Sequence, residues 1–160
     1  MTSIPALRPA TADDFDLLLE IRREVAADLQ QRGIPASPNG LTRNHLEEWT
    51  AAKVLWVGDL QGTVIGSIAV WFHDPTDHWP RSDRAAYVRD LMVSPRHRNE
   101  GIGAVMLSWA ERFSAGVGRR RVRLDCDSSN ARLLRYYSEA GYGRVGIDDE
   151  GFALFEKELV

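Results

Sequence analysis

The clearest pattern of apolar and polar positions lies in the second half of the chain, where an extended apolar run precedes a helical one. Residues 87–93 read YVRDLMV, and only Arg89 and Asp90 interrupt the apolar side chains, which is typical of a strand covered on both faces of a sheet. Pro95 follows and ends the run. From Ile102 onward the apolar residues recur with the i, i+3, i+4, i+7 spacing of a helix with one buried face. The members of this face are Ile102, Val105, Met106, Trp109, Ala110 and Phe113.

The loop between this strand and this helix carries groups that bind anions. It contains Arg96, His97 and Arg98, and Gly101 and Gly103 flank the predicted start of the helix. The N–H groups of a first helical turn have no partner inside the helix, and the positive end of the helix dipole lies at the same place. Glycine leaves that backbone uncovered. These features predict an anion-binding helix N-terminus.

Two interpretations of this loop follow from its residues alone. The first is a solvated turn whose glycines only allow a sharp change of direction. The second is a dinucleotide site of Rossmann type, because Asp125 ends the next strand at about the distance expected of the ribose-binding acid. The G-x-G-x-x-G fingerprint, however, has Met106 at its third glycine here, and Gly101 lies eight residues after Val93 instead of almost at the strand end. These departures argue against the dinucleotide site.

The rest of the pattern predicts a mixed α/β fold. Two strands joined at Gln61 and Gly62 form a hairpin signal, and the strand-helix-strand order that follows implies a crossover, so we expect a mixed sheet with helices on both faces. The predicted strands outside 87–93 are residues 4–8, 54–60, 63–72, 121–127 and 152–159, and the predicted helices besides that of Ile102 are residues 11–31, 42–52 and 130–140.

Length, charge and cysteine content narrow the functional classes. A chain of 160 residues with 44% apolar content favours one domain with a sizeable core. A net charge of −3 gives no general attraction to nucleic acid or to an anionic membrane, so neither partner is expected. Cys126 is the only cysteine, which excludes an intrachain disulfide. The N-terminal segment lacks a signal pattern and the apolar run 64–72 is too short to span a bilayer, so we expect a cytoplasmic protein.

Three stretches resemble the GNAT (Gcn5-related) superfamily of N-acetyltransferases. Residues 93–103, VSPRHRNEGIG, match that family's cofactor motif V-x-P-x-x-R-x-x-G-x-G. Residues 130–142, NARLLRYYSEAGY, follow its N-x-x-(small)-x-x-(apolar)-Y-x-x-x-G-(aromatic) helix, although Leu133 is larger than the usual alanine. Residues 155–159 look like its terminal strand. The motifs occur in the right order on the right predicted elements, and the resemblance covers nearly the whole chain.

The resemblance implies a fold and two functional halves of the domain. The expected fold is a GNAT-like mixed, mostly antiparallel sheet of about six to seven strands, with helices on both faces and a splay between the two central parallel strands. Residues 1–160 would form one acetyltransferase domain. Residues 1–84 would be its acceptor-side half, and residues 85–160 its acyl-CoA-binding half.

The resemblance also implies acetyl-CoA as co-substrate and no metal. In this arrangement pantetheine bonds to the main chain of residues 91–93, and the pyrophosphate lies on the N–H groups of residues 99–104 with Arg98 beside it. Asn130 would lie near the pantetheine or the thioester. The expected cofactor-binding residues are Leu91, Met92, Val93, Arg98, Asn99, Glu100, Gly101, Ile102, Gly103, Ala104 and Asn130.

Acyl transfer to an amine needs a proton acceptor. An alkyl ammonium of pKa about 10.4 must lose a proton before attack, which costs about 4 to 5 kcal/mol at pH 7 unless the site supplies a base. Asp125 occupies the strand position where several family members carry a catalytic acid residue, and Asp90 lies on the neighbouring strand. Either could accept the proton directly or through water. The alternative is an ion pair with Arg89 or Arg123.

The departing thiolate needs a proton donor, and Tyr137 matches the family's tyrosine general acid. The alternative is a core tyrosine on an apolar helix face. Cys126 is an unfavoured nucleophile because strand alternation puts it on one face with Val122 and Leu124, where burial is expected. The four histidines lack metal-ligand spacing, so no zinc site is expected.

The sequence therefore predicts an acetyl-CoA-dependent N-acetyltransferase that acts by direct attack on a primary amine, most simply one of a small molecule. The alternatives are a non-catalytic acyl-CoA-binding or regulatory module and an acetyltransferase acting on a protein N-terminus or lysine. A monomer or a homodimer is expected.

Overall fold

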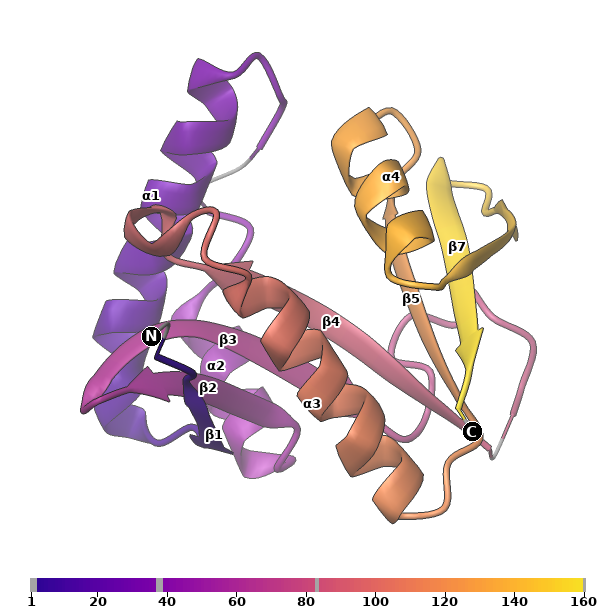
Figure 1. The fold of residues 1–160 in the computed structure, drawn as a ribbon, viewed down its shortest axis with the longest axis horizontal. Helices are drawn as coiled ribbons and strands as arrows, with labels where there is room; N and C mark the ends of the chain where they lie inside the picture. Colours follow the sequence, from indigo (N-terminus) through magenta and orange to yellow (C-terminus); the bar gives the residue numbers. More distant parts are fainter. Residues whose placement is uncertain (1–2, 37–38, 83, 160) are drawn as a thin grey trace. The chain divides into compact units, whose positions relative to one another are not determined.

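The computed structural model describes residues 3–36, 39–82 and 84–159, and the chain divides into two compact units. Unit 1 comprises Met1–Ala69 and Asp90–Trp109, and unit 2 comprises Val70–Arg89 and Ala110–Val160 (Figure 1). In the described part of the chain the strands are β1 (Ala6–Pro9), β2 (Leu55–Leu60), β3 (Thr63–Trp71), β4 (Ala85–Val93), β5 (Arg121–Asp127), β6 (Gly143–Ile147) and β7 (Phe152–Glu158). The α-helices there are α1 (Phe15–Gln31), α2 (Arg43–Ala51), α3 (Ile102–Gly116) and α4 (Ala131–Glu139), and short 3₁₀ turns cover Ala12–Asp14 and Pro95–His97.

The fold class predicted from the sequence is confirmed. The seven strands form a mixed, mostly antiparallel sheet in the order β1-β2-β3-β4-β5-β7-β6, in which β4 and β5 are parallel. Every strand and helix predicted from the pattern is present, with ends that shift by a few residues. The predicted start of the first helix is instead the 3₁₀ turn Ala12–Asp14, which leads directly into α1.

Strand β6 is the one strand or α-helix among the described residues that the pattern did not predict. Its sequence, GRVGI, contains two glycines, and its apolar residues Val145 and Ile147 are both 57% exposed. Because β6 lies at the edge of the sheet and pairs only with β7 in the described topology, it has no core-facing alternation to detect.

Unit 1 contains an antiparallel ladder and the two N-terminal helices. β1 pairs with β2 from Ala6↔Asp59 to Pro9↔Trp56, and β2 pairs with β3. The side chains of this unit that are almost inaccessible to solvent are Leu18, Leu46, Leu55, Val57, Ile65, Ile68, Met106 and Leu107. The first half of α3 therefore contributes its predicted apolar face to the core of this unit.

A partly buried ion pair fixes the start of α1. The main-chain N–H of Thr11 donates to Asp14 at 2.8 Å, which is half of the reciprocal capping arrangement expected there. Arg8 on β1 donates two hydrogen bonds of 2.9 Å to the same carboxylate. Asp14 is only 6% exposed, and the Arg8 guanidinium holds the pKa of Asp14 below its ordinary value although burial acts in the opposite direction.

Gly66 on β3 allows a close approach to the end of β4 within unit 1. A Cβ at this position would lie 2.3 Å from the Met92 carbonyl oxygen and 3.2 Å from the Val93 Cα. Next to it, the Ser94 N–H donates to the Ile65 carbonyl at 2.7 Å. The main chain of residues 92–94 is therefore held against β3 at a distance that only glycine permits.

Unit 2 is built around β5. Its first three residues pair in parallel with Ala85–Tyr87 of β4, and its full length pairs with β7 from Arg121↔Glu158 to Asp127↔Phe152. Helix α4 covers one face of this ladder (Figure 1). On that face the ring of Tyr137 contacts that of Phe155. In neither unit is any helix of the described residues both long enough and apolar enough to cross a bilayer.

Asp14→Asn is expected to lower the free energy of unfolding by about 1–3 kcal/mol at pH 7, because Arg8 then lies beside a neutral amide. Since the pKa of Asp14 is lower in the folded protein than the value of about 3.9 in an unfolded chain, its contribution is complete above pH 4 and is lost as the pH falls through the folded value. Urea denaturation at pH 7 and pH 3 measures this, and the difference from wild type should shrink at pH 3. The exposed neighbour substitution Asp13→Asn should change stability little at either pH.

Gly66→Ala is expected to lower the free energy of unfolding by about 1–3 kcal/mol or more, because the new methyl group overlaps a main-chain carbonyl that cannot move aside like a flexible side chain. Gly146→Ala is the matched control, since a Cβ there meets no atom within 4 Å. Equal urea midpoints for the two variants would contradict the close approach described here.

Candidate functional site

The loop that the sequence predicts to bind an anion lies within unit 1, and its anion binding stays a prediction. The Ser94 hydroxyl accepts the N–H of Arg96 at 3.3 Å and so caps the 3₁₀ turn after β4, and α3 begins at Ile102 as predicted. Asn99 and Gly101 have φ angles of +64° and +74°. These left-handed residues turn the chain into the helix, which leaves the N–H groups of the first turn of α3 at the end of the loop.

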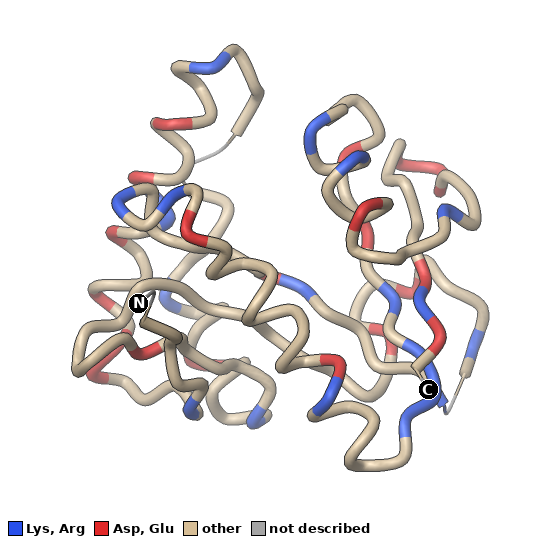
Figure 2. The backbone as a smooth tube through the Cα atoms, in the orientation of Figure 1, with Lys and Arg blue, Asp and Glu red and all other residues tan. Residues whose placement is uncertain are grey.

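The cations of this loop are ion-paired with acidic residues of α1. Arg96 donates to Glu24 at 3.0 Å, and Arg98 donates to Asp28. Asp28 also lies 3.5 Å from Arg32 on its own helix. Figure 2 shows basic and acidic positions meeting where the loop runs beside α1. The positive charge of the loop is therefore already partly neutralised. An anionic ligand would have to replace a carboxylate of α1 as the partner of these arginines.

Asp90 stands at an irregular position of β4 in unit 1. Its φ is +56°, which is unusual for a residue with a side chain and marks local backbone strain in the strand. The hydroxyl of Ser67, a fully buried residue on β3, donates to the Asp90 carboxylate at 2.8 Å. The strain lies directly before residues 91–93, the main chain expected to hold pantetheine, so the sequence-predicted base Asp90 also helps to set the path of that segment.

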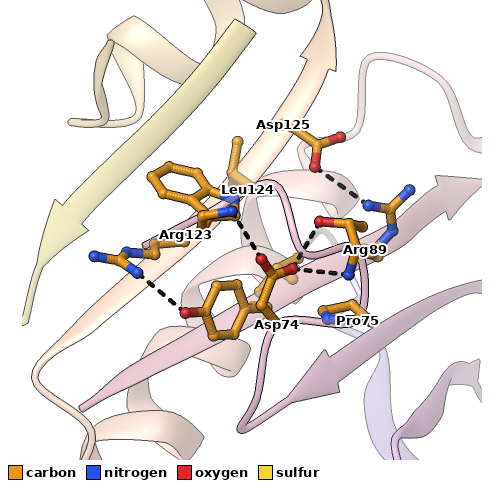
Figure 3. Close-up of a pocket in the computed structure, with 10 residues that line it drawn as sticks. Asp74, Pro75, Arg89, Arg123, Leu124 and Asp125 are labelled. Carbon is orange, nitrogen blue, oxygen red and sulfur yellow. Dashed lines mark hydrogen bonds and ion pairs between the residues drawn. The ribbon is translucent and has the colours of Figure 1, made fainter. Parts of the chain in front are cut away.

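Asp125 lies in unit 2 and forms the ion pair that was considered as its alternative role. Arg89 Nη1 lies 3.2 Å from Asp125 Oδ2 (Figure 3). The Asp125 side chain is 11% exposed, and burial raises the pKa of Asp125 above its ordinary value while the charge of Arg89 opposes that rise. The carboxylate thus has one fixed cationic partner. Its role as a base stays a prediction.

A small pocket of about 170 Å³, including its open mouth, adjoins this ion pair within unit 2. A loop from Asp74 to Trp79 covers it, and strands β4 and β5 form its floor. The Asp74 carboxylate accepts the N–H and hydroxyl of Thr76 and the N–H of Trp79, at 2.7–2.8 Å, which folds the loop back on itself (Figure 3). Burial of Asp74 would raise its pKa, but these hydrogen bonds outweigh burial and the pKa lies below its ordinary value.

Arg123 anchors this loop to the sheet. Its guanidinium donates to Glu156 at 2.8 Å, to the Tyr87 hydroxyl at 3.0 Å and to the Pro80 carbonyl at 2.9 Å. The Trp79 ring lies 4.8 Å from the guanidinium carbon. With its side chain only 8% exposed, Arg123 is committed to these contacts, so the ion pair considered for Asp125 is made with Arg89.

Tyr137 lies on the other face of the same ladder. Leu124 pairs with Phe155 and Arg123 pairs with Glu156, and residues directly opposite one another share a face. Tyr137 packs against Phe155, with a centroid distance of 5.9 Å, so it belongs to the Leu124 face, whereas Asp125 shares the Arg123 face. Burial raises the pKa of Tyr137, which keeps the phenol protonated at neutral pH. Its role as an acid is a prediction that its position does not test.

Asn130 and Cys126 have clear local roles in unit 2. The Asn130 side chain accepts the N–H of Leu133 at 3.1 Å and caps α4. Cys126 is buried, as expected from strand alternation. Burial, together with the charges of Asp125 and Asp127, raises the pKa of Cys126 to about 11. The thiol therefore stays protonated at neutral pH, which agrees with the low expectation for a cysteine nucleophile.

Sequence reasoning missed the partners that position these groups. Ser67 and Gly66 read as ordinary positions of an apolar strand, and no local signal links them to residues 90–93. His78 looked like an isolated loop histidine, yet it lies 2.9 Å from Asp148. Such contacts join segments far apart in the sequence, so spacing along one chain could not find them.

The comparison with known proteins agrees with the motifs. Residues 20–142 match the acetyltransferase (GNAT) family. The uncharacterized N-acetyltransferase YesJ of Bacillus subtilis is 38% identical over 77 residues, which is 48% of this chain and 43% of YesJ, so the chain spans under half the length of that relative.

Solved structures share the fold. The crystal structure of a GNAT-family acetyltransferase from Listeria monocytogenes superposes with a TM-score of 0.85 at 22% identity, covering 99% of each chain. The PaiA N-acetyltransferase of Thermoplasma acidophilum, solved in complex with coenzyme A, gives a TM-score of 0.68 at 19% identity, covering 96% of this chain and 98% of that one. With three motifs in order, the matched span and the shared sheet, the chain belongs to the acetyltransferase (GNAT) family.

Proposed function

We propose that this protein is an acetyl-CoA-dependent N-acetyltransferase that transfers the acetyl group to the primary amine of a small molecule by direct attack on the thioester. The observation that carries this proposal is the start of α3. There the signature residues Arg98, Gly101 and Gly103 stand at a helix N-terminus whose first N–H groups have no helical partner. The proposal treats residues 1–160 as one catalytic domain, with 1–84 on the acceptor side and 85–160 on the acyl-CoA side.

The residues at this loop fit the diphosphate of coenzyme A. Asn99, Glu100, Gly101, Ile102, Gly103 and Ala104 would offer main-chain N–H groups and Arg98 a guanidinium, which together suit a doubly charged group and need little reorganisation. The absence of a side chain at Gly101, whose φ is +74°, leaves the backbone there open to approach. In the same proposal the main chain of Leu91, Met92 and Val93 holds pantetheine, and Asn130 lies near the thioester. No step needs a metal.

Acetyl transfer then needs one proton removed and one supplied. As the amine nitrogen forms its bond to the thioester carbon and the carbon–sulfur bond breaks, Asp125 or Asp90 would take the amine proton directly or through water. Tyr137 would give its phenolic proton to the departing thiolate. The phenol of Tyr137 carries its proton when the step begins, while burial raises its pKa and so makes it a weaker acid than an exposed tyrosine.

The pocket of unit 2 supports a cationic acceptor. The carboxylates of Asp74 and Asp125 and the rings of Trp79 and Tyr87 line it, and an ammonium group interacts favourably with both kinds of group. Arg89 and Arg123 line it as well, but each is already paired with a carboxylate, Arg89 with Asp125 and Arg123 with Glu156. The enclosed space of this pocket takes about one water-sized group, which is far less than a whole drug-sized molecule needs. We therefore propose that the amine end of the acceptor enters here and that the rest of it stays outside.

Thiol release from acetyl-CoA is the direct test of this function. Spermidine, L-lysine, kanamycin and a peptide with a free N-terminus would be offered in turn, with calorimetry on coenzyme A as the binding measurement. Amine-dependent thiol release supports the enzyme. Binding without release by any amine would instead favour a non-catalytic acyl-CoA module, and release only with the peptide would move the acceptor to the protein class.

Arg98→Gln is expected to raise the dissociation constant of coenzyme A about tenfold, because one charge-assisted contact to phosphate is lost. Arg112→Gln, at an exposed position of α3 outside the loop, removes the same charge and should change the constant less than twofold. Calorimetry with coenzyme A measures both. Equal effects would mean that only net charge matters and that the loop does not bind the phosphates.

Tyr137→Phe is expected to lower kcat about 10- to 100-fold while the dissociation constant of coenzyme A stays within twofold, because only the acidic hydroxyl is removed. Tyr136→Phe on the same helix is the control and should retain wild-type turnover. If Tyr137→Phe also kept wild-type turnover, another donor or water would protonate the thiolate.

A further inference from the structure

Lys157 places a positive charge on the apolar face of the β5–β7 ladder in unit 2. It lies two residues after Phe155 on β7 and is paired with Val122 of β5, so strand alternation puts it on the face that Tyr137 covers. Its side chain is only 30% exposed. An ammonium group in such a place needs an anionic partner, because an unpaired charge is costly to bury.

Glu111, in the part of α3 that belongs to unit 2, is this partner and holds a second group as well. The Lys157 ammonium donates to Glu111 Oε1 at 3.1 Å, and the Tyr142 hydroxyl donates to Glu111 Oε2 at 2.8 Å. Burial and the charge of Glu111 raise the pKa of Tyr142, so this phenol keeps its proton at neutral pH and stays a donor to the carboxylate. Glu111, Lys157 and Tyr142 are called the α4 clamp below.

The α4 clamp holds the last turn of α4. The Lys157 ammonium also donates to the Ala140 carbonyl at 3.0 Å, and this carbonyl at the helix end is one of those that the helix itself leaves without a partner. The Tyr142 N–H donates to the Tyr137 carbonyl at 3.0 Å. Tyr137 therefore lies in a turn whose main chain is bonded to two members of the clamp.

The side chain of Tyr137 depends on the same region. Its ring centroid lies 6.1 Å from that of Tyr142, at an interplanar angle of 71°, and 5.4 Å from that of Tyr136, at 78°. Edge-to-face contacts of this kind are sensitive to where each ring lies. A shift of the Tyr142 ring would break its bond to Glu111, so that bond also maintains the contact with Tyr137.

Position decides whether a phenol can serve as an acid. Proton transfer needs the hydroxyl within about 2.6–3.2 Å of the atom that takes the proton. A displacement of about 1 Å, even from a change outside the site, can cost about 100-fold in rate. Because burial makes Tyr137 a weaker acid than an exposed tyrosine, its proposed transfer depends all the more on a short distance.

We propose that Glu111, acting with Lys157 and Tyr142, is a positioning residue for the proton donor Tyr137. This inference rests on the proposed N-acetyltransferase function and deepens it. As the carbon–sulfur bond breaks and its electron pair passes to the sulfur, Tyr137 gives that sulfur its phenolic proton, and water reprotonates the tyrosinate after the thiol leaves. The α4 clamp gives up no proton in this step and fixes the place of the donor.

The kinetic experiment introduces Glu111→Gln and Tyr142→Phe into the wild type and into Tyr137→Phe. The substrates are acetyl-CoA and whichever of spermidine, L-lysine, kanamycin and the peptide turns over fastest. In the wild type each change should lower kcat about 5- to 20-fold, while the dissociation constant of coenzyme A stays within twofold. In Tyr137→Phe the same changes should alter kcat less than twofold, because the group that they position is already gone. Glu139→Gln, at an exposed position of α4, is the matched control and should keep wild-type turnover.

A second measurement needs no acceptor. The chain has four tyrosines, so fluorine-19 NMR of protein labelled with 3-fluorotyrosine should give four signals, which single tyrosine-to-phenylalanine variants assign. Glu111→Gln should shift or broaden the Tyr137 signal and leave that of Tyr87 on β4 in place. Tyr142→Phe should act on the Tyr137 signal in the same way. An unchanged Tyr137 signal in both variants would overturn the proposal.

The kinetic outcomes separate the clamp from the proposed function. Equal losses of kcat in the wild type and in Tyr137→Phe would overturn the proposal, because the clamp would then not act through Tyr137. So would an active wild type whose turnover survives the clamp variants or Tyr137→Phe. If Glu111→Gln does not fold, Tyr142→Phe decides alone, since it keeps the packed ring and loses only the hydroxyl. A wild type that releases no thiol with any amine would instead overturn the proposed function, and the role of the clamp with it.

Discussion

The proposed site depends on unpaired main-chain N–H groups where α3 begins. A helix cannot satisfy these donors by itself, and here Gly101 in a left-handed conformation and Ser94 as a cap shape the loop that leads to them. The apolar face of α3, with Ile102 and Met106 almost fully buried, fixes the direction in which the donors point. The proposed anion site therefore depends on core packing, because the packing of α3 decides where these donors lie.

Strand β5 also places different groups on its two faces. Alternation sends Leu124 and Cys126 toward Tyr137 and sends Arg123 and Asp125 toward the loop over β4, so one strand separates an aromatic, apolar environment from a charged one. The two faces of a strand only seven residues long thus differ in polarity.

The elements with strong periodicity could be predicted from the sequence because local side chains encode them. The stripe of α3 and the alternation of residues 121–127 reappear with ends that match closely. β6 could not be predicted, since two glycines and an exposed edge leave it without a buried face. At the site, the motif residues Arg98 and Gly101 were visible in the sequence, but their environment was not. Three contacts show this: Arg98 with Asp28 across 70 positions, Asp90 with Ser67 across 23, and His78 with Asp148 across 70. Only the fold brings such residues together.

The contact of Arg98 with Asp28 has a consequence for how ionic strength acts on the loop. A guanidinium that stood free in water would lose affinity for a phosphate steadily as salt screened the attraction. Here added salt would weaken the Arg98–Asp28 ion pair as well as the attraction of Arg98 to a phosphate. The two effects on the affinity for phosphate have opposite signs, so they partly cancel. Glu24 and Asp28 of α1 therefore act as internal counterions, and the proposed affinity for phosphate would fall less with added salt than the count of arginines suggests.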